Sequence, residues 1–230
     1  ARAILIKKEA IVTKNPVMMQ ALVMNLRKNI FSDIRVRQAM TDAFDFQLMN
    51  KTLFYDQYER LESYFHGSEV AATGTPDDEE YQVLKPLLPK LEPIQRQAAV
   101  AKWQLAKSDG KGYHRQALLN ARQKLLEAGF YYQDMKLYQA NGKPARFEIL
   151  ITDEKISRVL LPYVRNLKKL GFEVSIRQVD TSQYLERLRR FDYDMIVAGF
   201  PQSTSPGSEQ SYMWGSAAAD EQGNQNYSGI

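Results

Sequence analysis

An alternation of apolar runs and helical patterns between residues 145 and 200 limits the fold more than any other feature of the sequence. Residues 145–151, 172–179 and 193–200 are apolar runs with the length of strands. Residues 154–170 and 182–190 lie between them and have the pattern of helices, the first with a proline at position 162 that is expected to kink it or to mark where its regular part begins. Strands joined through helices pair in parallel with right-handed crossovers. This part of the chain therefore predicts an α/β domain with a parallel sheet.

Further elements are expected outside this unit. Two more strands are predicted, at residues 3–6 and 20–24, and an Asn-Gly turn is predicted to join a strand at 136–139 to the strand at 145–151. Three helices are predicted at residues 76–84, 93–107 and 114–128. The last of these would present an inner face of five residues, namely Leu118, Leu119, Ala121, Leu125 and Leu126.

The stretch from residue 24 to residue 50 predicts two more helices. Ser32 is expected to cap the first, and Asp45 is expected to cap the second. The inner face of the first helix would carry Val36, Ala39, Met40 and Ala43. On periodicity alone, this is a core helix with a solvated basic face.

The charge pattern argues against a nucleic-acid partner. The chain of 230 residues has a net charge of +4, but its basic and acidic residues are interleaved, as at residues 85–92. A nucleic-acid site concentrates basic residues on one face. Cysteine is absent from the sequence, which excludes thiolate metal sites and disulfides. No apolar run approaches the roughly 20 residues of a membrane span, and no signal peptide is recognised at residues 1–10.

The sequence offers no recognisable set of catalytic or metal-binding residues. Its two histidines, His66 and His114, are not part of an H-E-x-x-H motif. The G-x-S-x-G and G-x-x-x-x-G-K-[ST] motifs are also absent. His114 begins a predicted helix and is expected to be exposed. We therefore predict a protein that is not an enzyme and that uses neither a metal nor a cofactor.

Position in the sheet is the better indicator of function. In open α/β sheets, ligands bind beyond the carboxyl ends of the strands. Two loops have this position, residues 152–154 and residues 201–205, and the second is rich in hydroxyl groups suited to a polar chain such as a peptide. Tyr212 and Trp214 follow and are expected either to stack on a ligand or to pack on the surface of the domain.

Several motifs carry a family resemblance. N-x-R at residues 25–27 is followed by F-x-D-x-R-V-R-Q-A at 31–39 and A-F-D-F-x-x-M-N-K-x-L-F-Y at 43–55. Y-x-R, S-Y-F, D-Y-D-M and G-F-P-Q-S-x-S-P-G follow at residues 58–60, 63–65, 192–195 and 199–207. This pattern resembles the family 5 extracellular solute-binding proteins, the receptors of dipeptide, oligopeptide and nickel ABC importers. Within that family it most resembles the YejA-like subgroup, which is linked to oligopeptide and microcin C uptake.

The resemblance implies a fold and a function. The fold would be the C-terminal lobe of a class C periplasmic-binding-protein-like (type II) fold, with a mixed, mostly parallel sheet flanked by helices. Residues 1–230 would form this single lobe, truncated at both ends, of a periplasmic protein more than twice as long. The whole protein, expected to be a monomer, would capture oligopeptides or peptide-like compounds between two lobes. It would then deliver them to the permease subunits of an ABC importer in the inner membrane.

The resemblance and the sheet positions together imply one wall of a binding cleft. Its residues would be Arg27, Tyr64, Thr152, Asp153, Phe200, Gln202, Ser203, Thr204, Tyr212 and Trp214. Dipeptide receptors of the family place an aspartate shortly after the aromatic residue that matches Phe200, and an arginine at the positions of Thr152 and Asp153. This sequence has neither, which favours longer peptides held through their backbone, or a modified ligand.

Two other classes of function stay open from the sequence. The chain could be an α/β enzyme whose catalytic residues come together only in space, and substrate turnover would identify it. It could also be a regulatory module that binds acidic partners through its basic excess, and salt-dependent retention of nucleic acid would identify that.

Overall fold

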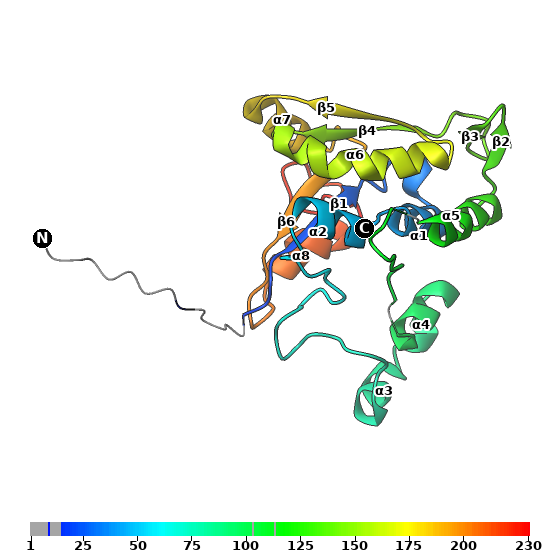
Figure 1. Cartoon of the computed structure of the whole chain (residues 1–230). Helices are drawn as coiled ribbons and strands as arrows, with labels where there is room; N and C mark the ends of the chain where they lie inside the picture. Colours follow the sequence, from blue (N-terminus) through cyan, green and yellow to red (C-terminus); the bar gives the residue numbers. More distant parts are fainter. Residues whose placement is uncertain (1–8, 10–14, 103, 113) are drawn as a thin grey trace, which may run out of the picture.

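The computed structural model describes residue 9 and residues 15–102, 104–112 and 114–230. These residues form an α/β body from which two short helices, α3 (Asp78–Leu84) and α4 (Pro93–Val100), stand away (Figure 1). The strand predicted at residues 3–6 lies outside the described residues. Within the described ranges, no helix has the length and apolar character needed to cross a membrane.

A four-stranded sheet in the order β1-β6-β4-β5 organises the body. β4 (Arg146–Ile151) pairs in parallel with β5 (Glu173–Gln178) and with β6 (Met195–Phe200). β1 (Met19–Met24) is antiparallel to β6. The prediction of an α/β fold with a mixed, mostly parallel sheet flanked by helices is therefore confirmed.

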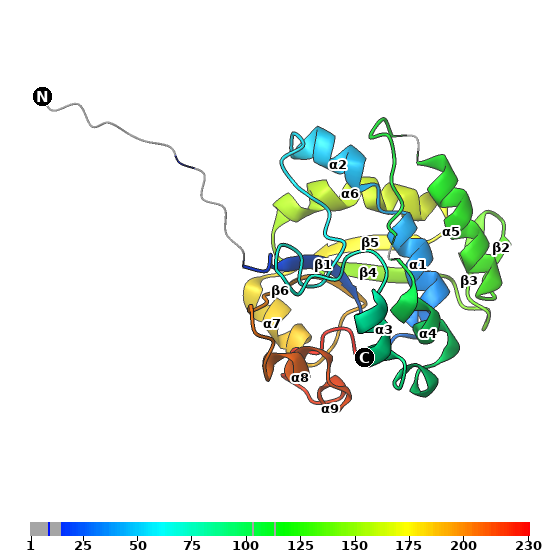
Figure 2. The ribbon, with the colours of Figure 1, turned by 90° about the horizontal axis from the view of Figure 1, so that it is seen from below.

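Alternating side chains of the strands build a core on each face of the sheet, because successive residues of a strand point to opposite faces. Ile149 and Met195 join the larger core, which includes residues of α1 (Ile34–Asp42), α5 (Arg115–Glu127) and α6 (Glu154–Lys169). Leu150 and Ile196 join the smaller core, which includes residues of α7 (Thr181–Arg189) and α8 (Glu209–Trp214). Figure 2 shows α5 and α6 on one side of the sheet and α7 and α8 on the other.

Local signals fix both ends of α6. At its start, the Asp153 side chain accepts a hydrogen bond of 2.9 Å from the Lys155 amide. At its end, Gly171 adopts a φ of +86°, and a Cβ at this position would lie only 3.0 Å from the Leu137 nitrogen. Between these ends α6 continues through Pro162 as one helix. Its regular part therefore begins at Glu154 and not at the proline.

The remaining elements are short. They are η1 (Asn29–Phe31), α2 (Phe46–Leu53), η2 (Leu88–Lys90), β2 (Tyr131–Gln133), β3 (Lys136–Tyr138) and α9 (Ser216–Ala219). The predicted Asn-Gly turn forms, since the Gly142 amide donates to the Gln139 carbonyl at 2.9 Å. The strand before it, however, pairs with β2 in a separate two-stranded sheet, whereas β4 joins the main sheet.

Helix α1 has its predicted inner face but a different cap. The four residues of the predicted face are fully buried: Val36, Ala39, Met40 and Ala43. The prediction that Ser32 caps this helix is wrong, because the carboxylate of Asp33 accepts the hydrogen bond from the Arg35 amide at 2.8 Å. Ser32 instead ends the preceding 3-10 turn, with its hydroxyl donating to the Asn29 carbonyl. Because Ser32 ends the 3-10 turn, α1 begins one residue later than predicted, and the cap falls to Asp33.

One predicted helix end and one predicted exposure are wrong. Helix α4 ends at Val100, short of residue 107, and none of its residues is buried. His114, in contrast, is buried, with a side chain only 2 % exposed. Its Nε2 lies 2.5 Å from the Asp42 carbonyl oxygen, and its Nδ1 lies 3.8 Å from Asp45 Oδ2. The start of α5 therefore packs against the turn between α1 and α2, a tertiary contact that helical periodicity does not encode.

Substitutions on α5 test which of its faces supports the body. Leu125 is fully buried, but Leu119 and Leu126, which were predicted on the same inner face, are 46 % and 43 % exposed, so this part of the prediction is wrong. We expect Leu125→Ala to lower the free energy of unfolding by about 3 kcal/mol, since it leaves a cavity in the larger core. Leu126→Ala is expected to change it by less than about 1 kcal/mol. Urea titration followed by circular dichroism measures both, and equal losses would contradict the assigned face.

Candidate functional site

The candidate site lies at the edge of the sheet where β4 and β6 end and β1 begins. Antiparallel pairing places Met19, the first residue of β1, opposite Phe200, the last residue of β6. Parallel pairing of β4 with β6 directs the carboxyl ends of both strands to this edge. The two loops predicted from the sequence, residues 152–154 and 201–205, therefore leave the same edge of the sheet.

Four of the predicted residues come together there as an aromatic cluster: Tyr64, Phe200, Gln202 and Trp214. The Trp214 ring stacks on Phe200, with centroids 4.9 Å apart and planes inclined by 29°. It also meets Tyr64 edge to face, with centroids 5.3 Å apart. Such pairs stabilise a site beyond the area that they bury. The cluster unites segments that are about 140 residues apart in sequence.

Hydrogen bonds centred on one hydroxyl group hold the aromatic cluster together. The Tyr64 hydroxyl accepts a hydrogen bond of 2.6 Å from Trp214 Nε1 and another from Gln202 Nε2. Gln210, which the sequence did not single out, donates to Gln202 Oε1 at 2.8 Å. Burial raises the pKa of Tyr64, and the two hydrogen bonds that its oxygen accepts partly oppose this rise. Tyr64 is therefore a neutral phenol at physiological pH and acts as a fixed hydrogen-bonding centre.

The loop that follows Phe200 is open to solvent and is organised by a carboxylate. Ser203 and Thr204 are both exposed. The Ser203 hydroxyl donates to the Ser205 carbonyl at 2.5 Å and lies 3.4 Å from Glu209 Oε1. Glu209 Oε1 also accepts a hydrogen bond of 2.8 Å from the Gly207 amide. Backbone amide donors, first that of Gly207, lower the pKa of Glu209, so this carboxylate stays ionised beside the exposed hydroxyl groups.

Thr152 and Asp153 lie at the same edge but serve the protein's own structure. The Asp153 carboxylate caps α6, as described above. The Thr152 carbonyl accepts a hydrogen bond of 3.3 Å from Gln178 Nε2. Asp153 is exposed and Thr152 is half-buried, so both side chains border the edge from the β4 side.

Arg27 is not brought together with the other candidates. It follows the end of β1, at the opposite edge of the sheet, where Met24 pairs with Met195. Its guanidinium group donates to the carbonyls of Ala219 and Asn226, the latter at 2.9 Å, and lies 3.7 Å from the centre of the Phe191 ring. Burial lowers the pKa of Arg27. In the structure, Arg27 ties the C-terminal segment to the turn after β1.

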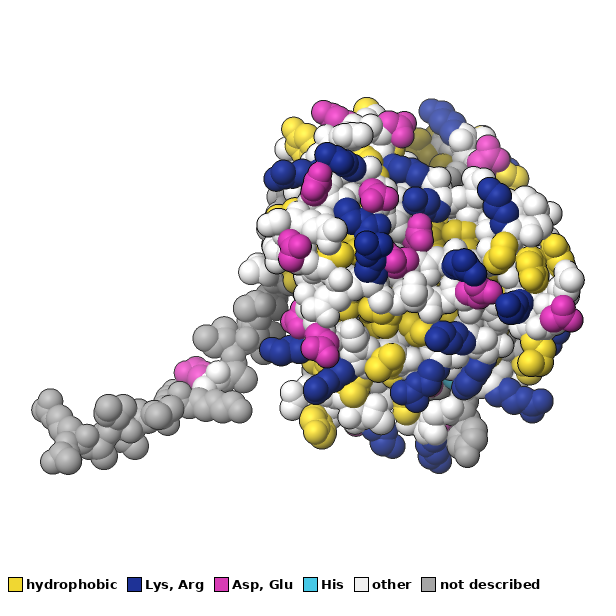
Figure 3. Space-filling view, turned by 90° about the horizontal axis from the view of Figure 1, so that it is seen from above, with side chains coloured by type: hydrophobic (Ala, Val, Ile, Leu, Met, Phe, Trp, Pro, Cys, Tyr) yellow, Lys and Arg dark blue, Asp and Glu magenta, His cyan; other side chains and the backbone are white. Residues whose placement is uncertain are grey.

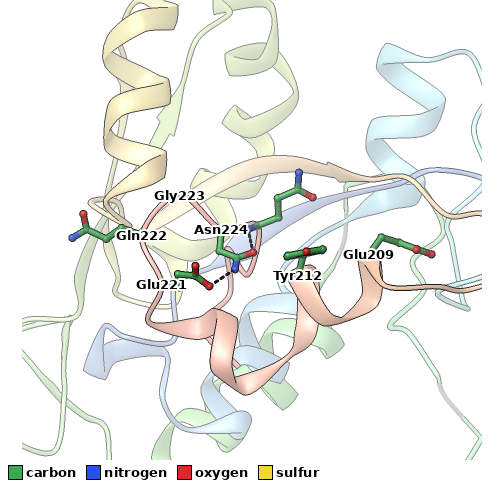
Figure 4. Close-up of a pocket in the computed structure, with 7 residues that line it drawn as sticks. Glu209, Tyr212, Glu221, Gln222, Gly223 and Asn224 are labelled. Atoms are coloured by element: carbon green, nitrogen blue, oxygen red, sulfur yellow. Dashed lines mark hydrogen bonds between the residues drawn. The ribbon is translucent and has the colours of Figure 1, made fainter.

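The segment held by Arg27 forms one wall of an open depression of about 500 Å³. Glu209 and Tyr212 of α8 line one side, and residues 221–225 line the other (Figure 4). In Figure 4, Asn224 faces Glu221, to which it donates a hydrogen bond of 3.0 Å. Tyr212 is 57 % exposed, so its ring is free to contact a molecule in this depression. No motif of the sequence indicated this wall.

Neither a metal site nor a concentrated charge marks the candidate site. Among the residues that the structure describes, no group of three or more histidines and carboxylates could hold a metal ion. Basic residues near the sheet pair with acids, as Arg187 does with Glu148 at 3.4 Å. Figure 3 shows Lys and Arg interspersed with Asp and Glu over much of one face.

Comparison with known proteins gives the family. Residues 2–222 match the model of the "Bacterial extracellular solute-binding proteins, family 5 Middle". The chain belongs to this family. The sequence resemblance to family 5, and to its YejA-like subgroup, is therefore confirmed.

Individual members of family 5 agree with this assignment. The chain is 40 % identical over 213 residues to the uncharacterized protein y4wM of Sinorhizobium fredii, covering 92 % of this chain and 32 % of that protein. It is 37 % identical over 228 residues to the probable peptide-binding protein YejA of Agrobacterium fabrum, covering 98 % and 37 %. The chain thus spans about a third of the length of these relatives.

A solved structure of family 5 confirms the fold. The oligopeptide-binding protein AppA of Bacillus subtilis, in complex with a nonapeptide, superimposes with a TM-score of 0.62 at 22 % identity. The match covers 94 % of this chain and 38 % of AppA. Of these proteins, YejA is named as a probable peptide-binding protein and AppA as an oligopeptide-binding protein.

Removing the Tyr64 hydroxyl tests the aromatic cluster. We expect Tyr64→Phe to lower the free energy of unfolding by about 1 kcal/mol, since two partly buried donors lose their acceptor. Tyr58→Phe is the matched control, because Tyr58 is 60 % exposed and lies outside the cluster. Urea unfolding measures both variants. A Tyr64→Phe variant as stable as the control would show that this hydroxyl does not hold the cluster.

Proposed function

We propose that this chain is the C-terminal lobe of a periplasmic receptor for an ABC importer, and that it binds peptides or peptide-like compounds. The observation that carries the proposal is the edge of the sheet, where an exposed loop rich in hydroxyl groups lies beside the aromatic cluster. The names of related proteins support it, since YejA is described as a probable peptide-binding protein and AppA holds a nonapeptide. Residues 1–230 would constitute this single lobe of a protein about three times as long.

The chemistry of the edge suits a peptide backbone. Ser203 and Thr204 offer hydroxyl groups that both donate and accept hydrogen bonds, as the amides of an extended peptide require. Tyr212 offers an exposed ring for an apolar side chain, next to the depression described above. Thr152 and Asp153 would border the same cleft from β4. This combination favours recognition of the backbone over any one side chain.

The mechanism that follows is closure of two lobes around the ligand. Ligand bound between the lobes selects the closed form, and the closed receptor docks on the permease subunits of the inner membrane. The receptor would act as a monomer without catalysis, cofactor or nucleic acid, and ATP hydrolysis would belong to partner subunits. Arg27 would support this cleft indirectly, by holding the C-terminal segment that lines the depression.

Glu209 would supply the charge that recognises an amino terminus. Dipeptide receptors are expected to use an aspartate shortly after the aromatic residue at this place, whereas here the nearest carboxylate in the loop is that of Glu209. The lowered pKa of Glu209 keeps it ionised, and its hydrogen bonds to the loop fix its position next to Ser203. An ammonium group of a peptide would therefore meet a preorganised negative charge.

A thermal-shift experiment on the full-length receptor tests the proposed function. Peptides of graded length are added at about 100 times their dissociation constant, where binding adds about 2.7 kcal/mol to the stability. We expect a raised melting temperature for one length class, and loss of that shift in Trp214→Ala. Met135→Ala is the control, since Met135 is 92 % exposed on the turn between β2 and β3. No shift with any peptide, or turnover of a substrate by the receptor, would refute the peptide-receptor assignment.

Titration with blocked peptides tests Glu209. We expect Glu209→Gln to weaken the binding of peptides with a free amino terminus about fivefold, because one exposed ion pair is lost. The same peptides with an acetylated amino terminus are expected to bind both forms equally. Isothermal titration calorimetry measures the four affinities. An equal loss for free and acetylated peptides would assign Glu209 to the structure of the loop instead.

A further inference from the structure

The helices α3 and α4 are folded but unsupported. Both stand away from the body in Figure 1. No residue of α3, of η2 or of α4 is buried. The exposed apolar side chains on this part of the chain are Tyr81, Val83, Leu87 and Ile94, of which Val83 is 71 % exposed. Four exposed apolar side chains within 14 residues are more than a singly scattered residue, and apolar surface gathered in this way is typical of an interaction site.

Local interactions nevertheless define both α3 and α4. Asp77 and Glu80 form a capping box at the start of α3, with hydrogen bonds of 2.9 and 3.1 Å. Arg96 of α4 donates to the carbonyls of Leu88 and Leu91, at 2.9 and 3.1 Å, and so joins α4 to η2. These helices have 7 and 8 residues, and helices shorter than about 12 residues are marginal in water without tertiary packing. A partner surface is therefore needed to stabilise them.

The contacts on each side of these helices indicate where a partner surface would lie. The chain that leads to α3 passes through Tyr64 of the aromatic cluster, and the His66 carbonyl next to it accepts a hydrogen bond of 2.8 Å from the Val17 amide, just before β1. After α4 the chain returns to the body, where the Ser108 hydroxyl donates to Asp45 Oδ1 at 2.5 Å. The chain before α3 therefore starts beside the candidate site, and the chain after α4 is anchored at the start of α2.

We propose that residues 77–101, named here the α3–α4 arm, dock on the remainder of the longer receptor polypeptide, beside the cleft. This inference rests on the proposed function, in which a second lobe approaches the same edge of the sheet. The related proteins are about three times as long as this chain, so most of the polypeptide that could cover the arm lies outside the sequence described here. The occupant would be an apolar surface of that second lobe, which takes up Val83 of α3 and Leu87 in the turn between α3 and η2.

Hydrogen–deuterium exchange without peptide tests the arm directly. We expect the amides of α3 and α4 to exchange at least tenfold more slowly in the full-length receptor than in the 230-residue chain. The amides of α5 serve as the reference, and their equal exchange would show that the body is folded in both proteins. Equal exchange of the arm in the two proteins would overturn the proposal. Because no peptide is present, a failure to bind peptides leaves this result unaffected.

Two neighbouring substitutions on α3 identify the docking face. Val83→Lys and Gln82→Lys each place a lysine four residues after an acid, Glu79 and Asp78, so their effects on the helix itself are matched. In the full-length receptor, Val83→Lys is expected to abolish the protection of the arm, whereas Gln82→Lys retains it. In the 230-residue chain neither variant is expected to change exchange. Protection that survives Val83→Lys would overturn the proposed face.

Sedimentation of the 230-residue chain separates the second lobe from a second copy as the occupant. We expect a monomer at all concentrations, with an arm that stays unprotected. Protection of the arm that rises with protein concentration, together with a dimer, would assign the exposed face to self-association and overturn the proposal.

Discussion

The pairing of β6 with β1 on one side and with β4 on the other is the interaction on which the rest of the structure depends. It joins residues 19–24 to residues 195–200, so the beginning and the end of the described body share one sheet. It also fixes the candidate site, because the register that places Met19 beside Phe200 decides which loops meet at one edge. β6 pairs along its whole length with β1 and through Met195 and Ile196 with β4, and these two ladders favour a single register.

A buried polar residue connects this sheet to the C-terminal segment. Asn25, fully buried after β1, donates to the carbonyls of Phe191 and Tyr193 at 3.0 and 2.9 Å, and its own Oδ1 accepts from Arg27 at 3.1 Å. Arg27 continues the connection to residues 219–226. Buried hydrogen-bonded networks specify one arrangement because leaving any member unpaired is costly. The N-x-R motif therefore holds the wall of the depression in place, although the motif lies at the end of the sheet opposite Phe200.

The candidate site and the α3–α4 arm are connected, because the chain that leads to α3 passes through Tyr64 of the aromatic cluster. Both expose side chains to solvent: Ser203 and Thr204 at the candidate site, and Val83 on the arm. Hydrogen bonds in the aromatic cluster hold Tyr64 in place. The chain that continues from Tyr64 leads to α3 and α4, which stand away from the body (Figure 1). In the proposed receptor both features would lie in one place, because contacts between lobes and contacts with ligand form together when binding selects the closed state.

The sequence by itself determined the local elements and the class of sheet. Alternating apolar runs, caps and glycines act over a few residues, which is why α3, α5, α6 and the strands β4, β5 and β6 were predicted close to their observed bounds. The positions of Phe200 and residues 201–205 at a strand end followed from the same local pattern. The family motifs added the resemblance that the comparisons confirm.

Only the tertiary structure decided which distant residues meet. Periodicity could not show that His114 is buried under the α1–α2 turn, since the contact with Asp42 spans 72 residues. Periodicity could not show that Arg27 lies away from the candidate site, because the direction of a strand in the sheet depends on pairing across some 170 residues. Nor could it show that no residue of α3 or α4 is buried. Burial and contacts between distant residues depend on the whole fold. Local sequence predicts them only where an element contacts the next element along the chain.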